Sequence, residues 1–172
     1  ILVGDILTLS KLQANSDDIV IESFDLCKEI ESILKKFEYL KETEGYIIEL
    51  VAPKEVNINA DKNKINQVIY NLLNNAINYT GKDKKVILKI TDNNNQYLIE
   101  IIDSGKGIDD VDIEHIWDKY YKNDKNHKRN IVGTGLGLSI VKEILVKHNF
   151  KYGVKSEKNK GTTFYFEINK TK

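Results

Sequence analysis

The segment from Asp61 to Tyr79 constrains the fold most strongly, because its hydrophobic residues recur at spacings of three and four. This spacing predicts a long amphipathic helix whose apolar face packs against the protein core. The apolar face comprises Ile65, Val68, Ile69, Leu72, Leu73 and Ala76. An adjoining polar stripe comprises Lys64, Gln67, Asn71, Asn75 and Asn78. We therefore expect a helix that is anchored by one face and presents amide side chains along another.

Asparagine is an unusual choice for such a helix, because its amide competes with the backbone for hydrogen bonds. The segment nevertheless carries Asn71, Asn74, Asn75 and Asn78. Two interpretations are open at this point. The asparagines either form a solvated surface in a sequence that is rich in this residue, or they face a polar ligand.

The rest of the chain predicts helices and strands in a mixed order. Further helices are expected at 1–15, at 25–45 and beyond Gly137, with a short amphipathic helix over 113–121. Strands are expected at 19–24, 46–51 and 56–60, and in two hairpins that pair 85–91 with 97–102 and 151–157 with 162–168. Helices grouped against a mostly antiparallel sheet make a two-layer α+β sandwich.

Composition bounds the class of protein. The chain has 172 residues, enough for one sizeable core, and its 26 Lys and Arg balance its 26 Asp and Glu. A protein that binds nucleic acid or a membrane surface by charge needs a basic excess, which this sequence lacks. No apolar run reaches the roughly 18 to 20 residues of a membrane span.

Reactive and metal-binding residues are sparse. Cys27 is the single cysteine, so an internal disulfide and a cysteine-rich metal site are excluded, and we expect a buried free thiol. The three histidines, His115, His127 and His148, show no ligand spacing. The sequence contains no methionine, even at position 1, so we expect it to begin inside a longer protein.

A first glycine segment, Asp103-Ser104-Gly105-Lys106-Gly107-Ile108, follows the predicted strand 97–102. Two glycines after a carboxylate would let a flat ligand approach the backbone while Asp103 accepts a hydrogen bond from an exocyclic amine. A surface turn is the alternative interpretation.

A second glycine segment, Gly133-Thr134-Gly135-Leu136-Gly137-Leu138-Ser139, leads directly into a predicted helix. Glycines ahead of a helix expose backbone N–H groups at the positive end of its dipole, which suits a phosphate chain. The segment is neither a P-loop, which needs Gly-Lys-Ser/Thr, nor a dinucleotide fingerprint, because Leu138 stands where the third glycine is required. A flexible connector is the alternative.

Taken in order, these segments resemble the N box and the two glycine boxes of the sensor histidine kinase catalytic domain, in the GHKL superfamily. Residues 116–122, 133–142 and 161–164 also match in family order. The resemblance covers about residues 19–170 and implies a Bergerat-type ATP-binding fold with three main helices on one face of a mixed, mostly antiparallel sheet. Residues 1–15 resemble the end of a dimerisation-domain helix, and residues 16–172 would form the catalytic ATP-binding domain.

The resemblance implies residues for the adenine side of the nucleotide. Asp103 would accept a hydrogen bond from the adenine amino group, and Thr162 would assist Asp103 through its hydroxyl. The other expected contacts come from Tyr79, which would pack on the base, and from Gly105, Gly107 and Ile108.

The resemblance also implies magnesium. Asn75 would ligate it through its amide oxygen, and Asn71 would support the phosphates. One amide ligand suits magnesium, which keeps waters and takes other oxygens from the nucleotide. The expected catalytic residues are Asn71, Asn75 and Lys122. The further expected phosphate contacts are Asn78, Lys122, Gly133, Thr134, Gly135, Leu136, Gly137 and Leu138, with residues 109–134 as a mobile lid.

Some positions depart from the family pattern. Asn78 stands where a basic residue is usual, and Lys122 replaces an arginine, which exchanges a bidentate fork for a point charge. These two changes put the phosphate contacts of both residues in doubt. Trp117 takes a usual Phe position and Asn149-Phe150 stand where glycines are common, so local effects are expected there.

The activity implied by the resemblance is transfer of the γ-phosphoryl group of ATP to a histidine on a dimerisation domain absent from this chain. The expected partners are that domain and a response regulator, with a homodimeric full-length protein, a monomeric fragment and no nucleic acid. The expected location is the cytoplasmic side of a membrane-anchored sensor.

Three other functions compete with histidine phosphorylation. A GHKL hydrolase places a Glu one turn before the magnesium Asn to activate water, whereas this chain has Asn71, whose amide is no base. Serine kinases of the anti-sigma-factor type also tend to keep that acidic residue. A nucleotide-binding regulatory module without catalysis is the third alternative.

Overall fold

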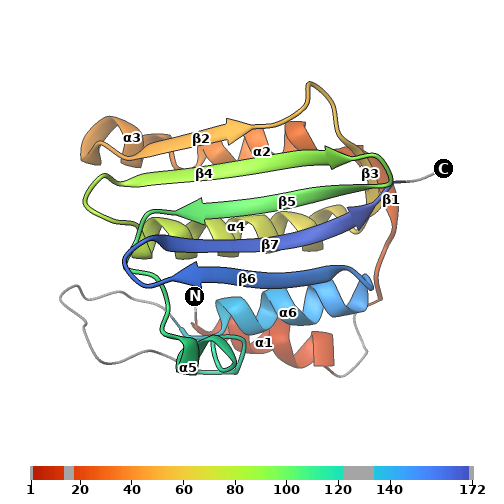
Figure 1. Cartoon of the computed structure of the whole chain (residues 1–172). Helices are drawn as coiled ribbons and strands as arrows, with labels where there is room; N and C mark the ends of the chain where they lie inside the picture. The colour runs from red at the N-terminus through yellow and green to blue at the C-terminus, as the bar shows by residue number, and fades with distance from the viewer. Residues whose placement is uncertain (1, 14–17, 122–133, 171–172) are drawn as a thin grey trace.

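The computed structural model describes residues 2–13, 18–121 and 134–170. It has two layers, in which helices α2 (Leu26–Lys35), α4 (Lys62–Tyr79) and α6 (Gly137–Lys147) cover one face of a five-stranded sheet (Figure 1). The predicted α+β sandwich with three main helices on one face is confirmed.

The sheet has the order β2-β4-β5-β7-β6 and is mixed. Its strands are β2 (Ile47–Val51), β4 (Lys85–Asn93), β5 (Gln96–Asp103), β6 (Lys151–Glu157) and β7 (Gly161–Asn169). Only β2 and β4 pair in parallel, and both predicted hairpins are present as antiparallel pairs. Because β5 also pairs with β7, the register places Asp103 opposite Thr162.

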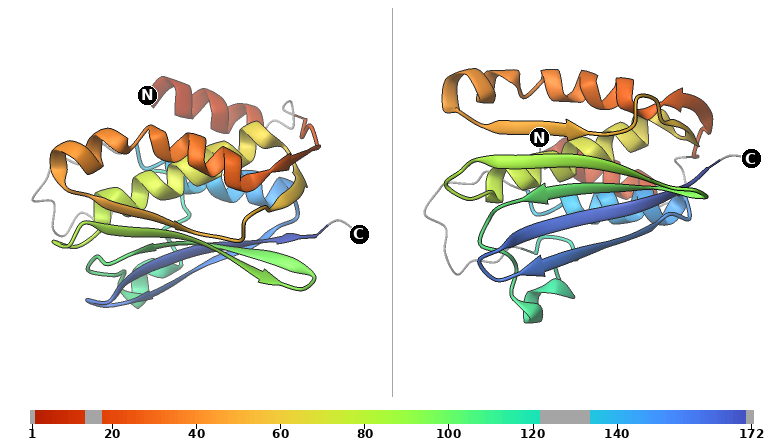
Figure 2. Two further views of the ribbon diagram at one scale, coloured as in Figure 1. Left: turned by 90° about the horizontal axis from the view of Figure 1, so that it is seen from above. Right: turned by 45° about the horizontal axis from the view of Figure 1, so that its top comes forward.

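A separate ribbon joins β1 (Glu22–Asp25) to β3 (Asn57–Ala60) in antiparallel fashion. The prediction of a strand over 19–24 is therefore wrong at its start, since pairing with β3 begins only at Glu22. This ribbon lies beside the helical layer and leads directly into α4 (Figure 2).

The long helix α4 has the predicted boundaries and orientation. The Asp61 side chain caps it by accepting a hydrogen bond from the Lys64 backbone N–H, 3.0 Å away. All six predicted apolar residues are buried, together with Ile77. The binary pattern therefore sets which face of α4 packs on the sheet.

The predicted single helix over 25–45 is divided in the structure. α2 ends at Lys35, and α3 (Glu38–Glu44) begins after Phe37, whose backbone leaves the helical region. Phe37 is buried and stacks on Tyr70 of α4, with ring centroids 5.5 Å apart. The helix is therefore interrupted where a core contact draws in an aromatic side chain, and Gly45 ends α3 in the left-handed conformation, as expected.

The predicted helix over 113–121 is wrong. α5 (Asp110–Ile113) ends where the prediction begins, and turns follow it. Trp117 packs edge-on against Tyr152 and Phe164, with ring centroids 5.0 and 5.6 Å away. Packing on β6 and β7 therefore overrides the helical pattern here.

The N-terminal helix α1 (Leu2–Gln13) packs on α6, on the side away from the sheet (Figure 2). Leu9 is buried in the core, while Ile6 and Leu7 are exposed.

Just after the C-terminal end of α6, Asn149 has a φ of 55° and its backbone N–H donates to the Val146 carbonyl. This explains why asparagine is tolerated where glycine is common, because it also adopts the left-handed conformation readily.

Candidate functional site

Most of the predicted site residues meet at one end of the sandwich. The last turn of α4, the end of β5, the start of β7 and the start of α6 lie together on the left side of Figure 1. Residues distant in the sequence therefore form one candidate site. Two predicted members, Lys122 and Gly133, lie outside the described residues, as does most of the predicted lid.

Asp103 is a buried carboxylate at the end of β5, with 4% of its surface exposed. The Gly105 backbone N–H donates to its Oδ1 over 2.8 Å, and the Thr162 backbone N–H is a second donor. Burial nevertheless raises the pKa of Asp103 to about 6, against the lowering effect of both hydrogen bonds. The site therefore holds a buried carboxylate whose two backbone donors do not offset the cost of removing it from water.

The glycines after Asp103 contact protein backbone. A Cβ on Gly105 would lie 2.0 Å from the Tyr79 carbonyl oxygen, and one on Gly107 would lie 2.3 Å from the Glu157 carbonyl oxygen. Gly107 also has a φ of +73°. Close approach of other protein segments therefore requires glycine at both positions, whether or not a ligand also lies beside them.

Thr162 lies beside Asp103, but its hydroxyl binds elsewhere. The Thr162 Oγ1 is 3.0 Å from the Oγ of Ser156, and the backbone N–H of Thr162 is the group that serves Asp103. The structure therefore shows support of Asp103 through the Thr162 backbone, and a part for the hydroxyl in binding stays a prediction. A hollow of about 310 Å³ borders these residues at the strand ends.

Ser156 was not predicted as a site residue. Its Oγ accepts a hydrogen bond from the Ile108 backbone N–H over 2.8 Å, so it joins β6 to the first glycine segment. The signal was present in the sequence, because Ser156 follows Tyr152 and Val154 at the strand period of two. A polar residue on the inward phase of a strand indicates a buried partner.

The asparagines of α4 differ in exposure. Asn71, Asn75 and Asn78 are half-buried, while Asn74 is exposed. The Asn71 Nδ2 donates to the Gly137 carbonyl over 3.3 Å and so joins α4 to the first residue of α6. Asn71 therefore faces the second glycine segment, which argues against a merely solvated surface at this position.

The described part of the second glycine segment is tightly held. The Leu136 backbone N–H donates to the Thr134 hydroxyl over 3.2 Å, and Leu136 itself is buried. Gly135 has a φ of +72°, and a Cβ on it would lie 3.0 Å from the Cα of Tyr120. Gly137 and Leu138 are half-buried at the start of α6. In this conformation, the Leu136 N–H expected to bind phosphate already has a protein partner.

Tyr79 and Ile108 flank the site. Tyr79 is 40% exposed at the end of α4, and burial of the rest raises the pKa of its hydroxyl. Ile108 packs against the core as a partly buried residue. The Tyr79 carbonyl lies against Gly105 and the Ile108 N–H binds Ser156, so the backbones of both residues adjoin the neighbours of Asp103.

The described residues include no group of three or more His, Cys, Asp or Glu side chains that could hold a metal ion. A metal bound with help from Asn75 would thus take one amide oxygen from the protein and its other oxygens from nucleotide and water. This donor set fits magnesium. His148 is engaged elsewhere, since its Nε2 accepts from the Asp61 backbone N–H over 3.1 Å.

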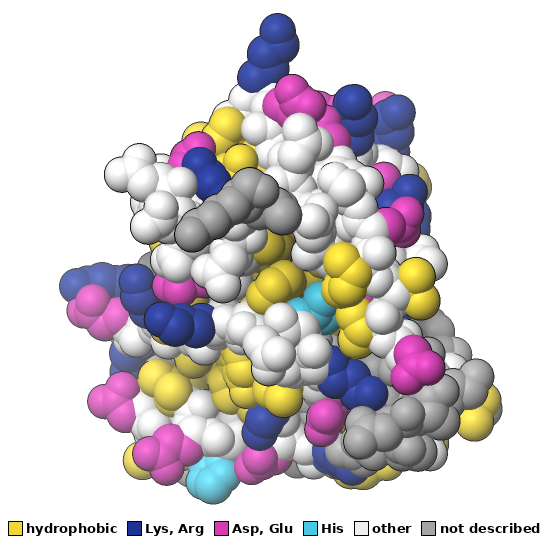
Figure 3. Space-filling model, turned by 90° about the vertical axis from the view of Figure 1, so that its right-hand side faces the viewer, with side chains coloured by type: hydrophobic (Ala, Val, Ile, Leu, Met, Phe, Trp, Pro, Cys, Tyr) yellow, Lys and Arg dark blue, Asp and Glu magenta, His cyan; other side chains and the backbone are white. Residues whose placement is uncertain are grey.

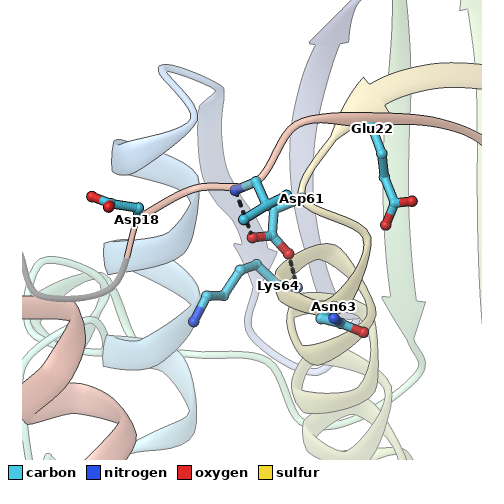
Figure 4. Close-up of a pocket in the computed structure, with 6 residues that line it drawn as sticks. Asp18, Glu22, Asp61, Asn63 and Lys64 are labelled. Carbon is cyan, nitrogen blue, oxygen red and sulfur yellow. Dashed lines mark hydrogen bonds between the residues drawn. The ribbon is translucent and has the colours of Figure 1, made fainter.

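A second hollow, of about 310 Å³, lies at the opposite end of α4 and is lined by Asp18, Val20, Glu22, Asp61, Asn63 and Lys64. The Asp61 carboxylate accepts hydrogen bonds there from the backbone N–H groups of Val20 and Lys64 (Figure 4). On this side of the molecule, positive and negative side chains are interspersed (Figure 3).

None of the described helices combines the length and the apolar composition that a membrane span needs.

The chain is similar to known proteins over most of its length. The profile of the histidine kinase-, DNA gyrase B- and HSP90-like ATPases matches residues 60–172. The sensor histidine kinase WalK of Bacillus subtilis (strain 168) is 32% identical over 169 residues, which are 97% of this chain and 28% of WalK. A sensor protein kinase WalK of Staphylococcus aureus is 34% identical over 97% of this chain and 40% of its own length. The chain thus spans less than half of these relatives.

Solved structures agree with the sequence relatives. The catalytic domain of histidine kinase ThkA has a TM-score of 0.77 at 28% identity, over 88% of this chain and 97% of that domain. Full-length ShkA in complex with AMPPNP has the same fold, with a TM-score of 0.84 at 22% identity over 97% of this chain and 35% of ShkA. The chain therefore belongs to the histidine kinase-, DNA gyrase B- and HSP90-like ATPases, as an ATP-binding domain of the sensor histidine kinase type with the Bergerat fold.

Proposed function

We propose that this chain is the catalytic domain of a sensor histidine kinase, which passes the γ-phosphoryl group of ATP to a histidine on a dimerisation domain. In this step the bond between the γ-phosphorus and its bridging oxygen breaks, and ADP leaves with the electron pair. The imidazole nitrogen forms the new bond to phosphorus, and a proton is released to solvent. The single observation that carries the proposal is the buried Asp103 carboxylate at the end of β5, next to the last turn of α4.

Asp103 binds the adenine amino group in this proposal. A buried carboxylate favours a ligand N–H donor, because the donor replaces the water that burial removed. Tyr79 and Ile108 supply the apolar walls for the ring, and Thr162 holds Asp103 through its backbone N–H. The base is thus fixed at the end of β5, with its triphosphate directed toward α6.

The phosphate side is formed by α4 and the start of α6. Asn75 holds magnesium through its amide oxygen, and magnesium, when bound, neutralises and aligns the triphosphate. Asn71 positions the glycine segment through its bond to the Gly137 carbonyl. The other phosphate contacts proposed for this side come from Asn78, Thr134, Gly135 and Leu138. Lys122 and Gly133, which lie outside the described residues, are proposed to add to them. For Leu136 and Gly137 to bind phosphate, the Thr134 hydroxyl must first release the Leu136 N–H.

Transfer is favoured over hydrolysis by the residue one turn before Asn75. Asn71 cannot take a proton from water, and its amide nitrogen is already bonded to Gly137. The absence of a general base typically lowers a rate by about 10²- to 10⁴-fold. We therefore expect slow ATP hydrolysis by the chain itself.

The proposed partners are a dimerisation domain that carries the acceptor histidine and a response regulator. The curated relatives are sensor kinases, and ThkA in complex with the response regulator TrrA resembles this chain with a TM-score of 0.77 at 25% identity, over 98% of this chain and 48% of ThkA. The exposed Ile6 and Leu7 of α1 suit the end of a dimerisation helix. The full-length protein is proposed to be a homodimer on the cytoplasmic side of a membrane anchor, and this fragment a monomer.

Incubation with γ-labelled ATP and magnesium tests the function, with and without an added histidine-bearing dimerisation domain. We expect acid-labile label on the added domain alone, because His115 and His148 are held by Asp118 and by Asp61 and Ile144. Label on the isolated chain, or rapid phosphate release without the added domain, contradicts the proposal and favours an autokinase or a hydrolase.

A further inference from the structure

Three polar residues form a row across the ends of neighbouring strands. Ser156 of β6 lies opposite Thr162 of β7, and Thr162 lies opposite Asp103 of β5. Opposed residues of antiparallel strands project from the same face of the sheet, with Cβ atoms about 4.5 to 5.5 Å apart. Thr162 and Asp103 are both buried.

The Ser156 hydroxyl makes three contacts. Its Oγ is 2.8 Å from the Ile108 backbone nitrogen, 3.0 Å from the Gly161 carbonyl oxygen and 3.0 Å from the Thr162 Oγ1. A hydroxyl has one proton and two lone pairs, so it can donate once and accept twice. These three partners therefore use the full hydrogen-bonding capacity of the Ser156 hydroxyl.

Only one assignment of donors and acceptors makes all three contacts hydrogen bonds, each with its own proton. Ile108 donates its N–H to Ser156, and the Gly161 carbonyl can only accept, so the Ser156 proton goes to Gly161. The contact between the two hydroxyls must then use the Thr162 proton. Thr162 is left with lone pairs only for any further partner.

We propose that Ser156 is a positioning residue that holds the Thr162 proton and so makes the base site present acceptors alone, from Asp103 and Thr162. This inference rests on the proposed binding of a nucleobase at Asp103. Two adjacent acceptors suit a base whose exocyclic group is an amine, as in adenine. They repel a base with a carbonyl at that position, as in guanine.

The consequence is a role for Ser156 in nucleotide selectivity. Without the Ser156 hydroxyl, the Thr162 proton is free to turn toward a carbonyl, so binding of GTP improves relative to ATP. One neutral hydrogen bond corresponds to a change of about threefold to tenfold in the ratio of the two dissociation constants. A residue that merely stabilises the sheet changes the affinity for both nucleotides together.

The test measures the dissociation constants of ATP and GTP, with melting temperatures, for the wild-type chain, Ser156→Ala, Thr162→Val and the double variant. We expect Ser156→Ala to lower the preference for ATP about threefold to tenfold, and to have no further effect on the preference in the Thr162→Val background. Ser156→Thr keeps the hydroxyl and should retain the preference. Thr91→Val, at the end of β4 away from Asp103, removes a threonine hydroxyl outside this row and should also leave it unchanged.

Two results overturn the inference. One is an equal loss of ATP and GTP affinity in Ser156→Ala, and the other is the same change in preference with and without the Thr162 hydroxyl. If Ser156→Ala does not fold, Thr162→Val must lower the preference by itself, and unchanged selectivity there is equally contrary. Failure of the proposed function is distinct, because Asp103→Asn would then leave ATP binding unchanged.

Discussion

A buried aspartate with two backbone donors lies at each end of α4. The surroundings explain why one carboxylate is buried, but they do not explain the other. Asp61 is 6% exposed and accepts from Val20 and Lys64 at the start of the helix, where the dipole favours a negative charge. Asp103 is 4% exposed and lies beside the last turn, where the dipole gives no such help. The fold accounts for the buried carboxylate of Asp61 through these contacts. It does not account for that of Asp103, because burial disfavours its ionised form.

The comparison teaches that the number of hydrogen bonds does not separate a structural carboxylate from a binding one. The two kinds of carboxylate are separated by their position on the helix and by their surroundings. Asp61 also anchors His148 through its backbone N–H, so the start of α4 is linked to the end of α6. The opposite ends of these two helices are where the glycine segments and the asparagine stripe meet.

The largest expected effect concerns the pH dependence of stability. The folded protein raises the pKa of Asp103 from 3.8 to about 6, so the folded state binds this proton more tightly than the unfolded chain does. The resulting stabilisation is complete below about pH 4 and is lost as the pH rises through about 6. Above pH 6, Asp103→Asn should therefore be more stable than the wild type by up to about 3 kcal/mol.

Urea denaturation of both proteins between pH 4 and pH 8 checks this prediction. The difference in the free energy of unfolding should grow with pH, and the wild type should be the protein that changes more. A difference that is constant with pH would show that folding does not raise the pKa of Asp103.

The next effect concerns phosphoryl transfer at the Asn75 end of α4. Asn75→Ala should lower the rate of transfer to an added dimerisation domain by about 10- to 100-fold, the range seen when residues around a metal are removed. ATP binding should fall less, because the base retains Asp103. Asn63→Ala, at the exposed opposite end of α4, is the matched control.

Transfer and ATP affinity are measured for both variants in the same preparations. Intact transfer by Asn75→Ala removes Asn75 from the magnesium site. An equal loss in Asn63→Ala would show that any change in α4, rather than one at the site, slows the reaction.

The smallest effect concerns the cap of α4. Asp61→Ala removes the acceptor for Lys64 and Val20 and should lower the free energy of unfolding by about 0.5 to 2 kcal/mol. ATP affinity, measured by calorimetry on the folded variant, should stay within about twofold of the wild type, because Asp61 is proposed to make no contact with ATP. Loss of one hydrogen bond to ATP would weaken binding by more than that. A large loss of affinity with little loss of stability would reverse the comparison between the two aspartates.

The parts of the fold that the sequence predicts are those whose cause is local. The buried face of α4 and the end of a helix at Gly45 each depend on residues within a few positions. The helix break at Phe37 and the loss of the helix over 113–121 have distant causes, namely Tyr70 in one case and Tyr152 with Phe164 in the other. Sequence periodicity carries no information about such contacts.

The same division holds at the candidate site. The motif order places Asp103, the asparagine stripe and the second glycine segment together, and the structure brings their described parts to one end of the molecule. The reason for Gly105 and Gly107 depends on Tyr79 and Glu157 and could not be read from spacing. The part played by Ser156 became visible only once the strand register placed it opposite Thr162.

The most direct test of the central claim is calorimetry of ATP binding to Asp103→Asn, with Asp61→Asn as a control of the same chemistry at the other end of α4. Loss of a charge-assisted hydrogen bond should weaken ATP binding to Asp103→Asn by about 10- to 150-fold, although the variant is at least as stable as the wild type at pH 7.5. Asp61→Asn should bind ATP with nearly wild-type affinity. Wild-type affinity in a folded Asp103→Asn would contradict the account, because the buried carboxylate would then have no part in holding the nucleotide.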